Sequence, residues 1–136
     1  MAIDLGDTRT GVAVSDATRT LAGHTETVVS RRTDDLLKRV SELARTHGAC
    51  TVVVGFPKNM NGTEGPRAAM ARDFADKLRQ ALPDTDVTLW DERVTTVQAH
   101  SIMNTTNTRG AKRKATVDAL AAALILEGYL GSLRNL

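Results

Sequence analysis

Residues 2–15 read AIDLGDTRTGVAVS, two short apolar runs on either side of a polar turn at 6–9. Apolar runs joined by Gly, Asp and Thr predict a β-hairpin. A third apolar run at 26–29 extends the hairpin into a three-stranded meander. An acid, Asp4, stands inside the first run, where an unpaired charge is unfavourable.

Beyond residue 30, helical and strand patterns alternate. The spacing of apolar residues predicts helices at 34–47, 66–82, about 95–103 and 113–131, and strands at 51–54 and 87–90. The run Thr51-Val52-Val53-Val54 is β-branched throughout, which is typical of a parallel strand buried on both faces. This order predicts an α/β fold with a mixed five-stranded sheet, in which an antiparallel meander precedes parallel strands and helices flank the sheet.

Composition limits the class of protein. The chain has 136 residues, 41% hydrophobic and 25% charged, which predicts one globular domain over 1–136 and excludes disordered, collagenous and coiled-coil proteins. The longest apolar run, 119–126, is far shorter than the roughly 18 residues of a membrane span, so no membrane partner is expected. The single cysteine, Cys50, is expected to act as a small buried hydrophobe at the start of a strand. One unpaired thiol and no secretory segment predict a cytoplasmic location.

Positive charge is concentrated near the C-terminus. The net charge is only +2, but residues 107–136 hold five basic and two acidic side chains. Four of the basic ones fall within six positions: Arg109, Lys112, Arg113 and Lys114. Such a cluster is typical of a surface that contacts phosphates, and a solvated loop with helix-end charges is the alternative.

Carboxylates occur where a site is expected. Asp4 lies in the first strand, Asp91 and Glu92 follow the strand at 87–90, and Asp118 lies in the last helix. If they converge at the carboxyl ends of the strands, divalent cations such as Mg²⁺ or Mn²⁺ would offset their repulsion. A pair of such ions supports phosphodiester cleavage. Each acid also has a structural interpretation, as a strand end, a helix cap or a partner of the helix dipole.

The loop at 55–65, GFPKNMNGTEG, precedes a helix N-terminus, where free amides attract anions. Lys58 and Arg67 add positive charge there. The loop lacks the Gly-Lys-Ser/Thr of a P-loop, which excludes nucleotide binding of that kind. A long structural turn is the alternative.

Four stretches together closely resemble the YqgF/RuvX family of bacterial proteins. They are DLGDTRTGVAVSD at 4–16, VGFPKNMNGTEGPR at 54–67, LWDERVTT at 89–96 and RGAKRKATVDALAAALILEGYL at 109–130. The family has an RNase H-like fold, and its members are described as Holliday junction resolvases and as nucleases that mature the 5′ end of pre-16S rRNA. The resemblance spans nearly the whole chain, with the motifs in the expected order.

The resemblance implies roles for single residues. Asp4, Glu92 and Asp118 match the metal-binding and catalytic carboxylates, with Asp91 as a competitor of Glu92. The implied cofactor is Mg²⁺ or Mn²⁺, as two ions. The implied phosphate contacts are Lys58, Arg93, Arg109, Lys112, Arg113 and Lys114.

The function expected from these features is metal-dependent cleavage of structured RNA, namely processing of pre-16S rRNA. A Holliday junction resolvase acting on four-way DNA junctions is the alternative, and symmetric cutting would favour a homodimer. A non-catalytic RNA-binding module is a further alternative. The first motif also resembles the phosphate loop of actin-like ATPases, but those proteins need two such domains.

Overall fold

The computed structural model describes residues 1–18, 22–56, 64–91 and 110–134, with side chains only from 117 to 133 in the last segment. The described elements are, in order, β1 (Ala2–Asp4), β2 (Arg9–Ser15), β3 (Ala22–Val29), α1 (Thr33–Thr46), β4 (Thr51–Phe56), α2 (Pro66–Ala81), β5 (Asp86–Asp91) and α4 (Gly110–Arg134). The helix expected at 95–103 lies outside the described residues.

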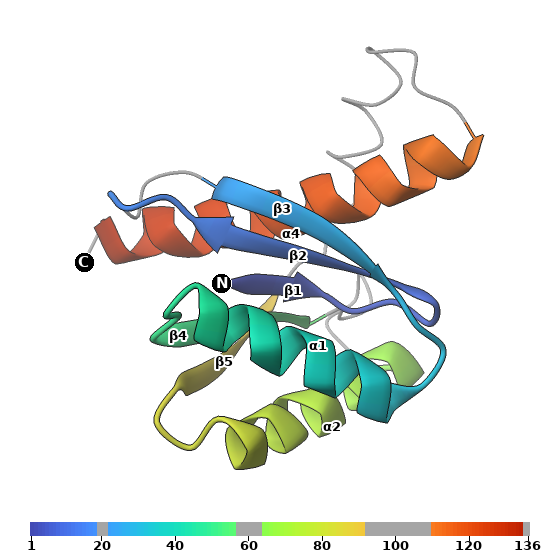
Figure 1. The fold of residues 1–136 in the computed structure, drawn as a ribbon, viewed down its shortest axis with the longest axis horizontal. Coiled ribbons are helices and arrows are strands. Elements are labelled where there is room, and N and C mark those ends of the chain that lie inside the picture. The colour runs from blue at the N-terminus through green and yellow to red at the C-terminus, as the bar shows by residue number, and fades with distance from the viewer. Residues whose placement is uncertain (19–21, 57–63, 92–109, 135–136) are drawn as a thin grey trace.

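The strands form a mixed five-stranded sheet in the order β3-β2-β1-β4-β5 (Figure 1). β1, β2 and β3 pair antiparallel, as the hairpin and meander predicted. β4 runs parallel to both β1 and β5, so the β-branched run lies in the parallel part of the sheet. The predicted α/β fold class is confirmed, and β1 is the central strand at which the two halves meet.

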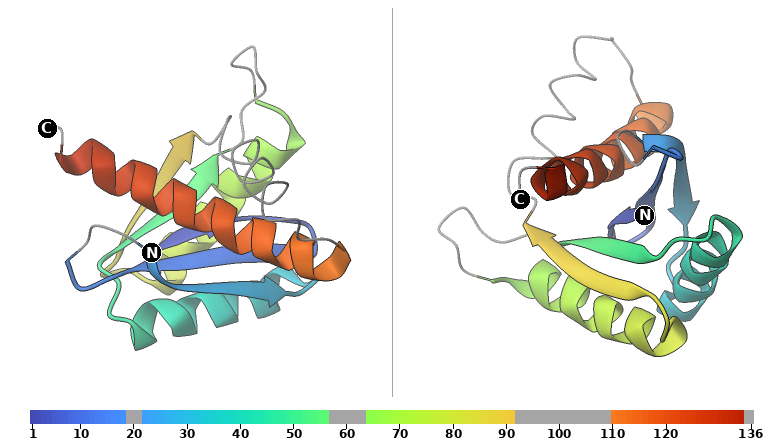
Figure 2. Two further views of the ribbon diagram at one scale, coloured as in Figure 1. Left: turned by 90° about the horizontal axis from the view of Figure 1, so that it is seen from above. Right: turned by 90° about the vertical axis from the view of Figure 1, so that its left-hand side faces the viewer.

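Helices cover both faces of the sheet: α1 and α2 lie on one face and α4 on the other (Figure 2). The alternation of side chains along each strand follows this division. In β1, Ile3 packs in the cluster with α1 and α2, whereas Ala2 packs in the cluster with α4. Asp4, two residues after Ala2, therefore belongs to the face that α4 covers.

Local sequence explains the helices. α1 buries one stripe, has two acids in its first turn, and is followed by Gly48 at φ 63°. α2 begins with Pro66, which fits the first helical position because that position needs no amide donor. Among the described residues, no helix combines the length and the apolar character needed to cross a membrane.

Some details differ from the sequence-based expectations. β3 starts at Ala22 rather than at 26, because its polar first half pairs with β2 at the edge of the sheet and leaves no apolar run. α4 starts at Gly110 rather than at 113. The expectation for Cys50 was wrong: it precedes β4 and is exposed, because the buried strand begins at the next residue.

The backbone of α4 approaches the sheet closely at Gly11 of β2. A Cβ atom built on Gly11 would lie 2.0 Å from the backbone oxygen of Asp118 and 3.2 Å from the nitrogen of Ala119. Real Cβ atoms do not approach backbone atoms so closely, so the helix can reach this position only because residue 11 has no side chain.

We expect Gly11→Ala to lower the free energy of unfolding by about 3 kcal/mol or more, because backbone rather than a flexible side chain must yield. Gly128→Ala, in the same helix, is the control: its Cβ would meet Trp90 Nε1 at an ordinary 3.6 Å. The free energy of unfolding of this variant should rise by up to about 1 kcal/mol, because alanine has a higher helix propensity than glycine. Urea unfolding of both variants measures the difference. Equal midpoints would show that α4 does not depend on Gly11.

Candidate functional site

Asp4 is the last residue of β1 and is half-buried at the centre of the sheet. The two residues before it, Ala2 and Ile3, are completely buried. Its cross-strand neighbour in β2 is Gly11. Since paired residues in adjacent strands point to the same face, Asp4 and Gly11 both face α4.

Asp118 comes to the same place from α4. It lies four and seven residues before Ala122 and Ile125, which are completely buried in the cluster between α4 and the sheet. That spacing places Asp118 on the stripe of the helix that faces the sheet. Its backbone oxygen sits directly over Gly11, the neighbour of Asp4. The structure thus brings together two of the three carboxylates expected from the sequence.

The third carboxylate was expected at Asp91 or Glu92. Asp91 is the last residue of β5, is exposed, and pairs with Phe56 of β4. Phe56 belongs to the cluster with α1 and α2, whereas Trp90 packs in the cluster with α4. Asp91 therefore lies on the face opposite to Asp4. Glu92 lies outside the described residues.

Three of the six expected phosphate contacts also lie outside the described residues, namely Lys58, Arg93 and Arg109. The backbone of residues 112–114 lies in α4, but the side chains of Lys112, Arg113 and Lys114 are not among those described. These three residues precede Asp118 by four to six positions. At 1.5 Å per residue, they are about 6–9 Å from it along the helix axis.

The chemistry of the site is that of oxygen ligands for a hard cation. Carboxylates are the ligands that Mg²⁺ and Mn²⁺ prefer. Asp4 pairs with Gly11 across the sheet, and the backbone of Asp118 lies directly over Gly11. In the described part of the chain, no group of three or more acidic, His or Cys side chains forms a metal site. Asp4 and Asp118 fit a divalent cation chemically, but they form an incomplete site without a further ligand.

Arg72 is a residue that the sequence did not single out, and it contacts the carboxyl end of β4. It lies in α2, with its guanidinium carbon 4.5 Å from the centre of the Phe56 ring at the end of β4. Its Nη2 donates to Glu64 Oε1 at 2.7 Å, and its Nε to Oε2 at 3.3 Å. The hydrogen bond with Glu64 raises the pKa of Arg72. Arg72 thus contacts both Phe56, at the end of β4, and Glu64, just before α2.

No local pattern predicts these contacts. Arg72 meets Phe56 and Glu64 only once β4 and α2 pack together, although the charges at 64 and 72 are visible in the sequence. The same holds for the contact of Gly11 with Asp118, which lie 107 positions apart.

Comparison with known proteins agrees with the fold and identifies the family. The model of a family described as "RuvX: Holliday junction resolvase" matches residues 1–132. A protein of Acetivibrio thermocellus named "Putative pre-16S rRNA nuclease" is 45% identical, with 97% of this chain and 94% of that protein covered. A protein of Geobacillus kaustophilus with the same name is 44% identical, with 98% of each chain covered.

A solved structure shares the fold. It is described as Thermus thermophilus RuvC in complex with a Holliday junction substrate, and it superposes with a TM-score of 0.58 over 97% of this chain and 92% of that chain. Its sequence identity is 19%, so this likeness concerns the fold alone.

We expect Arg72→Ala to loosen the start of α2, because Glu64 loses the cation that ties it to the end of β4. Hydrogen exchange should become faster at Ala69, whose amide bonds the oxygen of Gly65 in the first turn. Arg79→Ala, near the other end of the helix, is the control and should leave that turn unchanged. Unaltered exchange in Arg72→Ala would mean that the arginine does not hold this junction.

Proposed function

Because this chain belongs to the RuvX family, we propose that it is a metal-dependent nuclease that processes the 5′ end of pre-16S rRNA. The observation that supports this most is the placement of Asp118 over Gly11, beside Asp4, at the end of the central strand. The relatives named for pre-16S rRNA are covered over almost their whole length, so the likeness extends to all parts of the domain. Since bacterial pre-16S rRNA is made in the cytoplasm, the proposal places the activity there.

In this proposal, Asp4 and Asp118 hold Mg²⁺ or Mn²⁺, as two ions, together with Glu92. We choose Glu92 over Asp91 because Asp91 lies on the opposite face of the sheet. When bound, such ions stabilise charge on the scissile phosphate and activate a water molecule. The chain's own task would be to hold the carboxylates at fixed positions, and the close packing of α4 on β2 supports this role for Asp118.

Positive side chains would hold the substrate. The proposal assigns Arg93 to the scissile phosphate, because it directly follows Glu92 in the sequence. It assigns the neighbouring phosphates to Lys58, Arg109, Lys112, Arg113 and Lys114. Residues 112–114 lie on the turns of α4 that precede Asp118, which would align the nucleic-acid backbone with the carboxylates.

A Holliday junction resolvase is the second candidate, because the family's description and the RuvC likeness both refer to that substrate. Symmetric cleavage of a junction needs two active sites related by a two-fold axis, and hence a homodimer. An RNA-binding module without catalysis is the third candidate. Unlike the other two candidates, it predicts that the wild-type protein cuts no RNA and that removal of a carboxylate leaves the affinity for RNA unchanged.

We expect Asp4→Asn and Asp118→Asn to lower the cleavage rate by roughly a thousandfold, because each removes a charged ligand from the ions. The assay offers end-labelled pre-16S rRNA fragments and four-way DNA junctions side by side, with Mg²⁺ or Mn²⁺. Asp86→Asn is the matched control. Asp86 is an exposed aspartate at the start of β5, whereas the proposed site lies beyond the end of that strand, so this substitution should not change the cleavage rate.

The substrate that is cut separates the candidates. RNA cleavage that disappears in both site variants supports the proposal, and paired nicks in the junction would favour the resolvase. Binding of RNA with no cleavage of either substrate would leave the binding module.

We expect alanine at Lys112, Arg113 and Lys114 together to weaken RNA binding and to make its salt dependence shallower. Each phosphate contact contributes about 0.7 to the slope of log K against log salt for a single strand, so the loss of three should reduce that slope by about 2. The control removes three charges from α1 and α2, at Lys38, Arg45 and Arg79. Equal slopes for both triple variants would exclude the cluster from the binding surface.

A further inference from the structure

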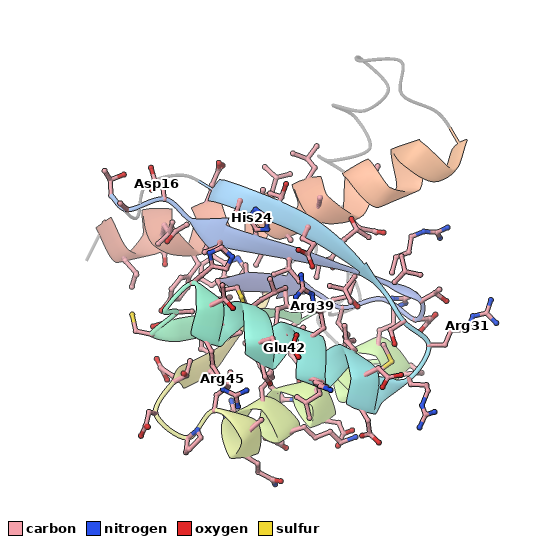
Figure 3. The ribbon with its side chains drawn as sticks, viewed as in Figure 1. Asp16, His24, Arg31, Arg39, Glu42 and Arg45 are labelled. Atoms are coloured by element: carbon pink, nitrogen blue, oxygen red, sulfur yellow. The ribbon has the colours of Figure 1, made fainter. Side chains whose placement is uncertain are left out.

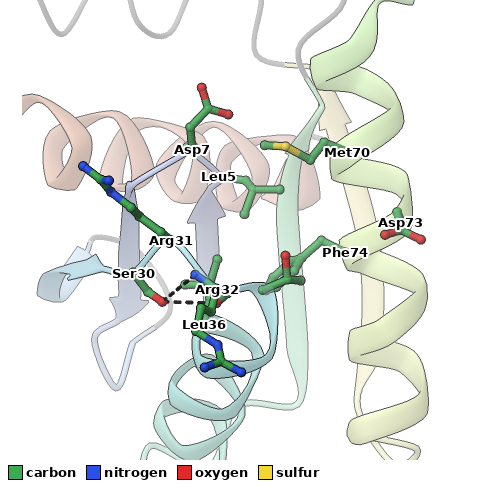
Figure 4. Close-up of a pocket in the computed structure, with 11 residues that line it drawn as sticks. Leu5, Asp7, Ser30, Arg31, Arg32, Leu36, Met70, Asp73 and Phe74 are labelled. Carbon is green, nitrogen blue, oxygen red and sulfur yellow. Dashed lines mark hydrogen bonds between the residues drawn. The ribbon is translucent and has the colours of Figure 1, made fainter.

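A cavity of about 190 Å³ opens beside β1 on the face of the sheet that carries α1 and α2. It is formed by the turn after β1, the connection from β3 to α1, and α2 (Figure 4). Its principal lining residues are Leu5, Asp7, Arg31, Leu36, Met70 and Phe74. None of these residues belongs to the carboxylate site described above.

The floor of the cavity is apolar. Leu36 and Phe74 are 5% and 2% exposed, so they form its base. Leu5 and Met70 are half-buried above them, and their side chains point into the cavity (Figure 4). Two flexible apolar side chains over a closed base suit the flat face of an aromatic ring, and the thioether of methionine contacts such rings favourably.

The acids at the rim have cationic partners of their own. Asp7 pairs with Arg67 at 3.3 Å, and Asp73 pairs with Lys77 at 3.3 Å. Each acid therefore adds little net negative charge to the opening.

The cations at the rim are less engaged. Arg32 has a long contact of 3.7 Å with Asp35. Among the residues that the structure describes, Arg31 has no ion pair. Its side chain extends away from the apolar floor into solvent, where β3 leads into α1 (Figures 3 and 4). The rim thus offers a positive group to an anion outside the cavity.

The cavity adjoins the carboxylate site along the chain. Leu5, one of its walls, directly follows Asp4, so the two Cα atoms are about 3.8 Å apart. Asp4 faces α4, and Leu5 packs against the opposite cluster. A strand passing the end of β1 would meet the carboxylates on one side and the cavity on the other.

We propose that this cavity receives the unstacked base of a single-stranded nucleotide next to the scissile phosphate, and that Arg31 contacts the phosphate of that nucleotide. The volume is below the roughly 300–1,000 Å³ of sites for larger ligands, so it suits one base rather than a dinucleotide. An apolar floor binds bases of any sequence, because every base has an aromatic face. The proposal rests on the proposed nuclease function for the position of the scissile phosphate.

The test compares two fluorescent decamers of equal charge, one of uridines and one of abasic ribose phosphates, in EDTA so that no cleavage occurs. Wild type should bind the uridine decamer roughly tenfold more tightly. Met70→Trp, which fills the cavity, should abolish that preference. Arg31→Ala should weaken binding of both decamers by a similar factor, because it removes a phosphate contact. Lys38→Ala, an exposed lysine on α1 outside the cavity, is the control and should change neither affinity.

A preference that persists in Met70→Trp would overturn the proposal, as would unchanged affinities in Arg31→Ala, an exposed-residue variant that should fold normally. Absence of any preference in wild type would overturn it as well. Cleavage is scored separately: if wild type cuts no RNA with metal present, the nuclease proposal fails. The preference for bases still decides whether the cavity binds them.

Discussion

The contact between Gly11 and the backbone of Asp118 determines the arrangement at the carboxyl end of the central strand. A helix can pack this closely on a sheet only where the strand has no side chain. That single position allows α4 to bring its aspartate beside Asp4, in a half-buried place where two like charges are unfavourable without a cation. The rest of α4 supports the contact, because Ala122 and Ile125 pack without exposure against the same face.

The two faces of the sheet carry different sites. The face under α4 holds the carboxylates, and the face under α1 and α2 holds the larger part of the core together with the cavity lined by Leu5 and Met70. Successive side chains of a strand point to opposite faces of the sheet. Asp4 therefore faces α4, and the next residue, Leu5, faces the cavity. Arg72 of α2 contacts Phe56 at the end of β4 and Glu64 just before α2.

The sequence predicted the sheet because its signals are local: an alternation of apolar runs, turns and helical stripes. It also singles out Asp4 as a candidate ligand, because a charge inside an apolar strand is unfavourable unless it is paired. It did not predict the face of Asp91, which depends on where β5 ends, or the exposure of Cys50, which depends on where β4 begins. The contact of Gly11 with Asp118 and the cavity could not be predicted, because each joins segments that are distant in the chain.

An anomalous difference map from crystals of the wild-type protein soaked in Mn²⁺ would test directly whether Asp4 and Asp118 bind metal. If packing of α4 at Gly11 creates a metal site, the strongest peak should lie between the carboxylates of Asp4 and Asp118, at about 2.0–2.3 Å from their oxygens. The same soak of Asp118→Asn crystals should lose or weaken that peak. Mn²⁺ bound elsewhere, with none at these two aspartates, would show that the packing of α4 at Gly11 creates no metal site.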